Sequence, residues 1–495
     1  MSDVFQSNIP LWAVSISLLA TLGILVSGRK PNLREFWTLL AGLIKFGLVL
    51  SLLPSVRAGK IAECVLLQVS PGIGLSLRAD EFGVFFALIA SGLWIFTSIY
   101  SIGYMRSNQE LKQTRYFASF AVALSATLGV AFAGNLLTFV IFYEMLTLAT
   151  YPLVIHKETG EALRAGRQYL AYSLTAGVLL LAGTAWIYNT AGTIEFQPGG
   201  ILGGVEAAPN AIRCLFFVFV AGVGVKAGIM PLHSWLPNAM VAPTPVSALL
   251  HAVAVVKSGV FGVVRVVGFV FGPEVMAEHG LNLILAVLAG ATVLFSSLIA
   301  LQQDSLKRRL AYSTIGHLSY IVMGAALLTP EGLTGGIYHI STHAVMKITL
   351  FFCAGAIYVH THKQNVSELD GIGRAMPWTI GAFTLGSLGL VGIPPINGFF
   401  SKWFLCLGSL QAGWPMVLAL FILSGLLNAA YLLPVVYRGF FRKSEEFAKF
   451  DEAPPLMVVP LCTTAALALV LGLFPNLFFD FFELASGISE MILAS

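Results

Sequence analysis

Charged side chains are scarce in this sequence. Asp, Glu, Lys and Arg make up 11% of its 495 residues and hydrophobic residues make up 57%, whereas charged residues form about 25% of an ordinary soluble domain. The mean hydropathy is +0.84. A chain this apolar cannot expose most of its surface to water, so we expect an all-α, polytopic membrane protein.

Paired cysteines and basic clusters are also missing. The five cysteines form no C-x-x-C motif, which argues against an iron–sulfur cluster or a structural zinc ion. The net charge of +4 is spread over loops, so no nucleic-acid site is expected. We predict no cofactor and no metal. The first ten residues contain no Lys or Arg, so the first apolar run is expected to be a retained helix and not a signal peptide.

Long apolar segments are what the sequence does contain. Each is near the roughly 20 residues that a helix needs to cross a bilayer. The fourteen predicted segments are 8–27, 36–54, 82–104, 115–133, 136–156, 166–190, 211–230, 240–264, 281–301, 311–329, 333–359, 376–396, 414–437 and 456–475. Residues 60–80 alternate in polarity and contain Pro-Gly, which predicts a short extramembrane hairpin. A short amphipathic tail follows Pro475.

The distribution of Lys and Arg predicts how these segments are oriented. Eighteen of the 28 basic residues fall in one alternate set of loops and five in the other set. Cytoplasmic loops carry the excess of positive charge, so both termini are predicted to lie outside the cell. The remaining five residues lie inside apolar segments and are Lys45, Lys226, Lys257, Lys347 and Lys402.

Two of the predicted spans share a proline motif. Residues 227–231 read AGIMP and residues 391–395 read VGIPP, so each contains G-I-x-P. Proline removes a backbone donor and breaks a helix. Interruptions at corresponding positions of two halves are typical of transporters built from inverted repeats, although two matches this short can also arise by chance.

A single carboxylate lies deep in a predicted span. It is Glu144, in NLLTFVIFYEMLTLATYPLVI. It is either a structural carboxyl bonded to a neighbouring helix, or an ion site in which a lysine allows it to ionise. Lys226 and Lys402 lie beside the two predicted breaks and Lys257 lies mid-span, so we interpret them as functional and not as snorkelling side chains. Lys45 has no motif around it, and we interpret it as structural.

The segment IYHISTHAVMKITLFF carries three ionisable groups four residues apart, His339, His343 and Lys347. On a helix they span about 80° and climb about 12 Å, so they form one polar stripe. Because His and Lys can exchange protons, the stripe predicts a proton relay. The alternatives are a structural stripe facing a polar helix and a zinc site, but no third ligand lies nearby in the sequence. Singly, His251 and His317 can equally be core histidines.

The assembled pattern resembles a known family, the antiporter-like proton-pumping subunits shared by respiratory complex I, Mrp-type cation/proton antiporters and membrane-bound hydrogenases. Four stretches carry the resemblance: the Glu144 segment quoted above, KAGIMPLHSWLPNAMVAPTPVSALLHAVAVVKSGVFG, the stretch from RRLAYSTIGHLSYIVMGA to IYHISTHAVMKITLFFCAGAI, and GIPPINGFFSKW. The long second stretch is the most specific.

The resemblance implies a role for each residue that matches the family's motifs. Glu144 and Lys226 match its glutamate–lysine pair. Lys257 matches a bridging lysine, while His343 and Lys347 match the central relay. Lys402 matches the family's terminal lysine. His251 and His339 match secondary polar positions along the family's polar axis.

The resemblance also implies an architecture. The family fold contains two inverted five-helix repeats, each with a broken helix. We therefore expect an N-terminal three-helix segment at 1–114, half-channel repeats at 115–270 and 281–441, and a C-terminal helix with a short tail at 442–495. The longest family members carry an extra lateral helix, and this chain resembles the shorter type although its WLPNAMVAPTPVSALLHA segment resembles the longer one.

The buried charges and the resemblance together imply a subunit of a multi-subunit complex in a prokaryotic inner membrane that moves H⁺, with Na⁺ as a possible second ion. The parent complex would be an Mrp-type antiporter, or a redox pump like complex I (an NADH:quinone oxidoreductase) or a hydrogenase, and the subunit itself would hold no redox site. The alternatives are a haem-binding subunit of the cytochrome b kind, which leaves the buried lysines unexplained, and a structural subunit that moves no ions.

Overall fold

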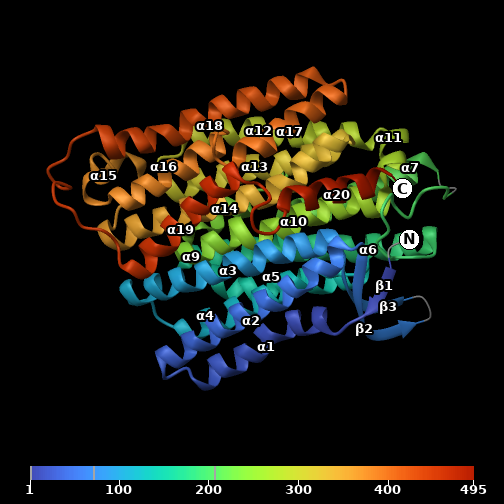
Figure 1. Ribbon diagram of the computed structural model, residues 1–495, viewed down its shortest axis with the longest axis horizontal. Helices are drawn as coiled ribbons and strands as arrows, with labels where there is room; N and C mark the ends of the chain where they lie inside the picture. The colour runs from blue at the N-terminus through green and yellow to red at the C-terminus, as the bar shows by residue number, and fades with distance from the viewer. Residues whose placement is uncertain (1–2, 71–72, 206–207, 495) are drawn as a thin grey trace.

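The computed structural model describes residues 3–70, 73–205 and 208–494, and these residues form a bundle of long helices with one small sheet (Figure 1). All fourteen predicted spans are helical. Within the described ranges, twelve helices are long and apolar enough to cross a membrane. The other two predicted spans are α4 (Gln113–Ala131), which carries Ser and Thr among its apolar residues, and α16 (Pro377–Val391), which stops at a break after 15 residues.

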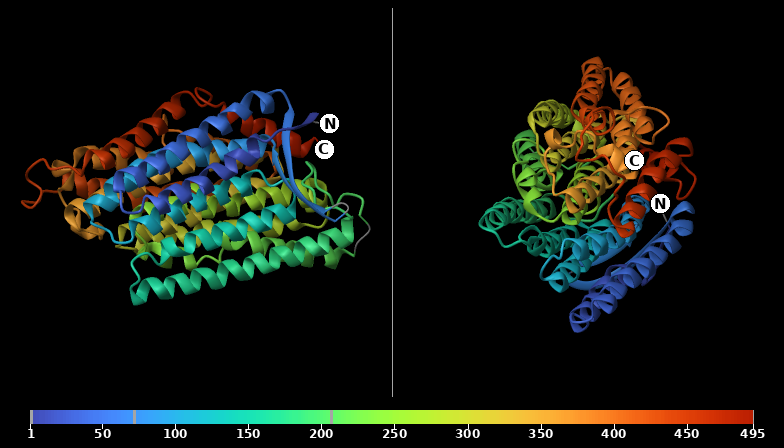
Figure 2. Two further views of the ribbon diagram at one scale, coloured as in Figure 1. Left: turned by 90° about the horizontal axis from the view of Figure 1, so that it is seen from below. Right: turned by 90° about the vertical axis from the view of Figure 1, so that its left-hand side faces the viewer.

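The twelve long helical segments run along the length of the bundle (Figure 1). They are α1 (Ile9–Val26), α2 (Pro31–Arg57), α3 (Glu81–Ser107), α5 (Leu136–Val154), α6 (Gly160–Ala191), α7 (Pro209–Ala227), the segment Thr244–Phe271, α12 (Leu281–Gln302), α13 (Leu306–Leu327), α14 (Pro330–Thr361), α18 (Pro415–Phe441) and α19 (Pro455–Leu473). Seen along the helices, α1 and α2 form one edge of the bundle (Figure 2).

Helix α14 lies in the core of the bundle. It packs against α13, α16, α17 (Gly398–Gln411), α19 and α20 (Phe481–Leu493), and its most apolar stretch is completely buried in protein. Its first turn is capped by Thr329, whose hydroxyl accepts from the Gly332 amide at 3.3 Å. Because α14 faces protein on every side, the histidines and lysine on it are not exposed to lipid.

Both predicted breaks are present. Helix α7 ends at Ala227 and is followed by Gly228 at φ 70°, and α16 ends at Val391 before Gly392 at φ 95°. Only glycine adopts this left-handed backbone freely. The chain resumes as the short α8 (Trp235–Asn238) after the first break and as α17 after the second. The grouping of the helices into two inverted repeats, and the domain bounds drawn from it, remain predictions.

The predicted hairpin is confirmed and belongs to a larger sheet. Strands β2 (Lys60–Ser70) and β3 (Ile73–Ala79) pair antiparallel, and β1 (Asp3–Gln6) adds a parallel strand that the sequence did not indicate. The Pro71-Gly72 dipeptide lies outside the described residues. Arg78 ties the sheet together through an ion pair with Glu63 at 2.8 Å. The predicted amphipathic tail is the helix α20, whose apolar face packs on α14 and α3.

The two ends of the bundle differ in charge. The sheet and both ends of the described chain lie at one end, at the right of Figure 1. The loops rich in Lys and Arg meet at the other end, where Lys112 and Arg115 pair with Glu158 and Lys363 pairs with Glu446 at 3.1 Å. The loops that were predicted to share one side of the membrane therefore lie together. Which side faces the cytoplasm remains a prediction.

Candidate functional site

The predicted site residues lie mid-helix or beside one of the two helix breaks. Glu144 is on α5, Lys226 is in the last turn of α7, Lys257 is on α10 (Val255–Arg265), and Lys402 is on α17. Six of the eight side chains are completely buried, while Glu144 and Lys402 are partly buried. A buried charge in a membrane is costly and is usually functional. We call Glu144, Lys226, Lys257, His343, Lys347 and Lys402 the buried axis.

The first end of the buried axis holds its one carboxylate. Neither oxygen of Glu144 has a hydrogen-bond partner among the described residues, and the side chain packs against Gly177 of α6, where a larger residue would collide with it. Lys226 does not form a direct ion pair with Glu144. Its amine donates instead to the Tyr143 carbonyl at 2.5 Å and lies 3.4 Å from the centre of the Tyr143 ring. Lys226 is therefore linked to Glu144 through Tyr143, the residue that precedes Glu144 in the sequence.

A glycine contact connects α7 to the centre of the bundle. A side chain at Gly259 would collide with the backbone of Lys226 and Ala227, so α10 and the end of α7 touch at this point. Two residues earlier on α10, the amine of Lys257 lies 2.8 Å from Nδ1 of His343. This bond connects the part of the buried axis on α10 to the part on α14.

Three histidine rings are stacked at the centre. His317 of α13 lies with its ring 5.3 Å from both His339 and His343, and its Nδ1 is 3.1 Å from Nε2 of His339. The second nitrogen of His339 is 2.8 Å from the Ser401 hydroxyl of α17. The members of the predicted stripe have their hydrogen-bond partners on other helices, His343 on α10, Lys347 on α13, and His339 on α13 and α17.

Lys347 begins a line of hydroxyl and amide groups. Its amine donates to Ser313 of α13 at 2.8 Å, and the Tyr431 hydroxyl of α18 lies 3.0 Å from the same oxygen. Tyr431 also donates to the side-chain oxygen of Asn428 at 2.5 Å. The side-chain nitrogen of Asn428 lies 3.2 Å from Nε2 of His317. Asn428 is therefore bonded both to the histidine stack and, through Tyr431 and Ser313, to Lys347.

The line ends at the second helix break. Asn428 donates to the Leu390 carbonyl at 3.2 Å, and Lys402 donates to the same carbonyl at 2.5 Å and to the Val391 carbonyl at 3.0 Å. These carbonyls are free because α16 ends there. Near the first break, the Val225 carbonyl in the last turn of α7 accepts from the Trp235 indole at 2.8 Å.

His251 lies apart from this network. It is on the π-helical turn η2 (Leu249–Val253), and neither ring nitrogen has a partner within the described part of the chain. Its ring packs 5.0 Å from that of Phe351. Leaving buried polar atoms unpaired costs about 1–3 kcal/mol, and π-helical turns occur often at functional sites. This position is therefore unexplained by packing alone.

Sequence reasoning missed the groups that join the predicted residues. They are Ser313, Ser401, Asn428 and Tyr431, together with His317, whose role was left open. One signal was available, because Asn428 is the only amide in α18 and Tyr431 follows three residues later on the same face. Lys45, by contrast, is completely buried on α2 and has no partner among the residues described.

The fold and the site define a multi-pass helical membrane protein with a buried basic axis. Residues 133–428 match the family described as NADH:quinone oxidoreductase/Mrp antiporter, transmembrane. The chain belongs to this family.

Relatives from three kinds of complex are similar over most of the chain. NADH-quinone oxidoreductase subunit N of Desulforudis audaxviator is 30% identical, with 94% of this chain and 96% of that protein aligned. A Na⁺/H⁺ antiporter subunit of Alkalihalophilus pseudofirmus is 28% identical over 81% of this chain and 80% of that protein. Hydrogenase-4 component B of Escherichia coli is 29% identical over 81% of this chain and 62% of that protein.

Two solved structures share the fold. The Mrp complex of Dietzia sp. DQ12-45-1b contains a chain that superposes with a TM-score of 0.86 at 21% identity, covering 98% of this chain and 99% of that one. An archaeal membrane-bound sulfane sulfur reductase contains another, with a TM-score of 0.87 at 23% identity and the same coverage. At these identities the likeness shows the fold alone.

Proposed function

We propose that this chain moves protons through the membrane along the buried axis. The observation that supports this most strongly is the continuity of the second half. Lys257 bonds to His343, and from Lys347 to Lys402 each polar group lies within 3.5 Å of the next. The ring of His317, stacked on His343 and bonded to Asn428, joins the two series. A structural polar patch has no need to connect several buried lysines.

The chemistry of the axis favours proton exchange. Lys257 and Lys347 are bonded to groups without negative charge, an imidazole and a hydroxyl. Each can therefore release its proton without leaving a buried anion behind. Two unit charges 4 Å apart interact with about 4 kcal/mol at an effective dielectric constant near 20. Protonating one group thus opposes protonation of the next, and a charge entering at one end drives release further along.

The single carboxylate gives the axis a direction. Glu144 lies at one end beside Lys226, and Lys402 lies at the other end against backbone carbonyls. Protonating or deprotonating Glu144 changes the electrostatic potential at Lys226, and the charge on Lys226 in turn affects the next lysine along the axis. We assign His339 a secondary role through its bonds to His317 and Ser401. His251, whose ring is unpaired within the described chain, also has a secondary role.

The named relatives suggest the setting. They are subunits of an NADH-quinone oxidoreductase, a Na⁺/H⁺ antiporter and a hydrogenase. We propose that this chain works beside other membrane subunits in a prokaryotic inner membrane, with both termini outside, in an Mrp-type antiporter or a redox pump. Na⁺ is a second candidate ion because one relative is named for it.

The test compares two substitutions of Lys347 in the whole complex, expressed from its own genes in cells that lack the native copy. Lys347→Met keeps the stem but deletes the charge, so proton transport should fall sharply while the subunit remains abundant, because removing a buried cation does not harm folding. Lys347→Arg should also impair transport, because guanidinium does not give up its proton. Proton movement in membrane vesicles is measured beside subunit abundance.

Lys45→Met is the matched control, since Lys45 is equally buried but lies on α2, away from the axis. It should leave transport unchanged. A structural stripe predicts the opposite pattern: Lys347→Arg would transport normally and Lys347→Met would be poorly assembled. That result would overturn the proposed function.

A further inference from the structure

The end of the bundle that carries the basic loops contains a cavity of about 540 Å³. It lies between the loop after α5, the starts of α6 and α13, and the end of α14. This volume is within the roughly 300–1,000 Å³ typical of ligand pockets. Five basic side chains line it against one acidic side chain, Glu161; the basic ones are Lys157, Arg164, Lys307, Arg308 and Lys363.

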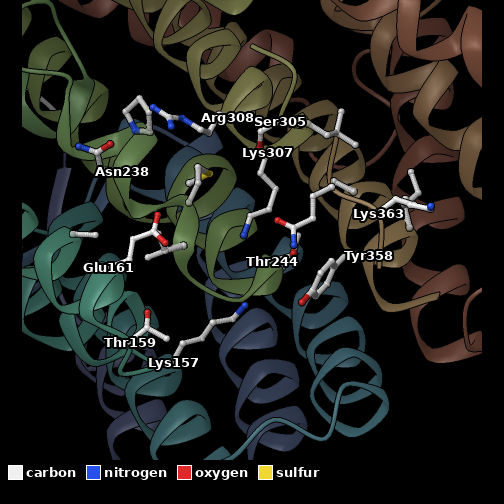
Figure 3. Close-up of a pocket in the computed structure, with 18 of the residues that line it drawn as sticks. Lys157, Thr159, Glu161, Asn238, Thr244, Ser305, Lys307, Arg308, Tyr358 and Lys363 are labelled. Atoms are coloured by element: carbon white, nitrogen blue, oxygen red, sulfur yellow. The ribbon is translucent and has the colours of Figure 1, made fainter. Parts of the chain in front are cut away.

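Two of these lysines point toward each other. In Figure 3 the amines of Lys157 and Lys307 extend into the same space, with the side chain of Tyr358 beside them. Lys363 points away, and it is paired with Glu446 at 3.1 Å. Like charges repel, so an anion bound between the two amines would stabilise their charged forms.

The donors of these lysines are largely unused. An ammonium group has three N–H donors. Lys307 gives one of them to the Ala242 carbonyl at 2.6 Å. The Lys157 amine lies over the Tyr358 ring, 5.7 Å from its centre, and makes no hydrogen bond or ion pair with the described residues. Arg164 and Arg308 make no ion pair or hydrogen bond with the rest of the described chain. The cavity therefore offers several N–H donors and a net positive charge to one ligand.

We propose that this cavity is a binding site for a phosphate group. A tetrahedral anion with several acceptor oxygens matches converging lysine and arginine donors, and charge-assisted hydrogen bonds of this kind are the strong ones. The cavity lies at the ends of membrane helices, the level of lipid headgroups, and basic pockets between helices there bind anionic headgroups. The phosphate can belong to an anionic phospholipid or to a soluble phosphate compound. This inference does not depend on the proposed proton transport.

The test measures thermal unfolding of the full chain, purified in detergent with neutral lipid only. In one arm inorganic phosphate replaces chloride at constant ionic strength. In the other arm phosphatidylglycerol replaces phosphatidylcholine in the mixed micelles. A saturable rise of the unfolding temperature is expected in at least one arm. A rise with phosphate indicates a soluble ligand, and a rise with phosphatidylglycerol alone indicates a headgroup.

Variants locate the site. Lys157→Gln should raise the ligand concentration needed for half of the temperature rise about tenfold or more, because it removes a charge-assisted hydrogen bond. Lys157→Arg should retain the response, since guanidinium also binds phosphate. Lys443→Gln, at an exposed lysine of the same end outside the cavity, should match the unmodified protein. The proposal is overturned if neither arm gives a saturable rise, or if Lys443→Gln weakens the response as much as Lys157→Gln. An acidic segment of a partner protein as the true ligand would give the first of these results.

Discussion

The amine of Lys257 lies 2.8 Å from Nδ1 of His343, and this bond joins α10 to α14 at the centre of the bundle. No carboxylate is bonded to either group in the described structure. Because neither partner is an anion, the bond can form from a protonated Lys257 to His343 or from a protonated His343 to Lys257. This property distinguishes the pair from an ion pair, in which both groups stay charged.

Replacing His343 should separate proton exchange from structure. His343→Asn keeps an acceptor for Lys257 but cannot be protonated, so transport should be lost while the subunit assembles. His343→Ala leaves the buried amine without a partner, which should also lower stability by about 1–3 kcal/mol. Transport and thermal unfolding are measured for both variants. Normal transport by His343→Asn would remove His343 from the pathway.

Glu144→Gln should abolish transport without harming the fold. Both carboxylate oxygens are unpaired in the described structure and the side chain fills the space beside Gly177, so an amide of the same shape fits. Subunit abundance should be unchanged and proton uptake should fall to background. As a positional check, Gly177→Ala should displace the carboxylate and reduce transport. Unimpaired uptake by Glu144→Gln would show that the carboxylate is structural.

Tyr431→Phe should slow transport while leaving the protein stable. The change deletes the hydroxyl between Ser313 and Asn428 and keeps the ring. A neutral hydrogen bond contributes about 1 kcal/mol, so the rate should fall about fivefold. Tyr338→Phe is the control, because Tyr338 of α14 packs against Phe482 and lies outside the network. Equal rates for the two variants would indicate that the Tyr431 hydroxyl plays no part.

His156, in the loop after α5, should make stability depend on pH. Burial, with a smaller contribution from Arg115, lowers the pKa of His156 to about 4, against about 6.5 in an unfolded chain. Between these two pKa values the unfolded state binds more protons than the folded state. The contribution of His156 to the free energy of unfolding is therefore greatest above pH 6.5 and decreases as the pH falls toward 4. Glu110, 3.9 Å away, is the nearest acid.

The measurement is the unfolding temperature at pH 7.5 and pH 5. His156→Asn should lose less stability than the unmodified protein over this interval. Glu158 in the same loop does not interfere, because hydrogen bonds from Lys112 and Arg115 lower its pKa to about 2. An identical pH dependence in both proteins would contradict the assignment.

The orientation can be tested by cysteine labelling. Cys214 is exposed, so the test needs a Cys214→Ser background. An impermeant reagent on intact cells should leave Ser305→Cys unlabelled and should label Ser495→Cys. Ser305 lies at the basic end, whereas Ser495 lies outside the described residues. Labelling of Ser305→Cys from outside would reverse the predicted orientation.

The sequence predicted what depends on local patterns. Apolar length indicated the spans, glycine and proline indicated the breaks at Gly228 and Gly392, and alternation indicated the hairpin. The joining groups could not be predicted, because Ser313 and Asn428 matter only through the packing of α13 and α18 against their neighbours. For the same reason, the family resemblance implied a Glu144–Lys226 pair but not the Tyr143 carbonyl that accepts a hydrogen bond from the lysine.

The position of the axis has an electrical consequence. Its residues lie mid-helix or beside the breaks within the bundle, so the axis runs across the bundle and not from one end to the other. A membrane voltage of 100 mV changes the energy of a unit charge by about 2.3 kcal/mol only when the charge crosses the whole membrane. Under the proposed function, protons that move between Lys226 and Lys402 cross little of the field, and the voltage acts on the steps by which ions enter and leave.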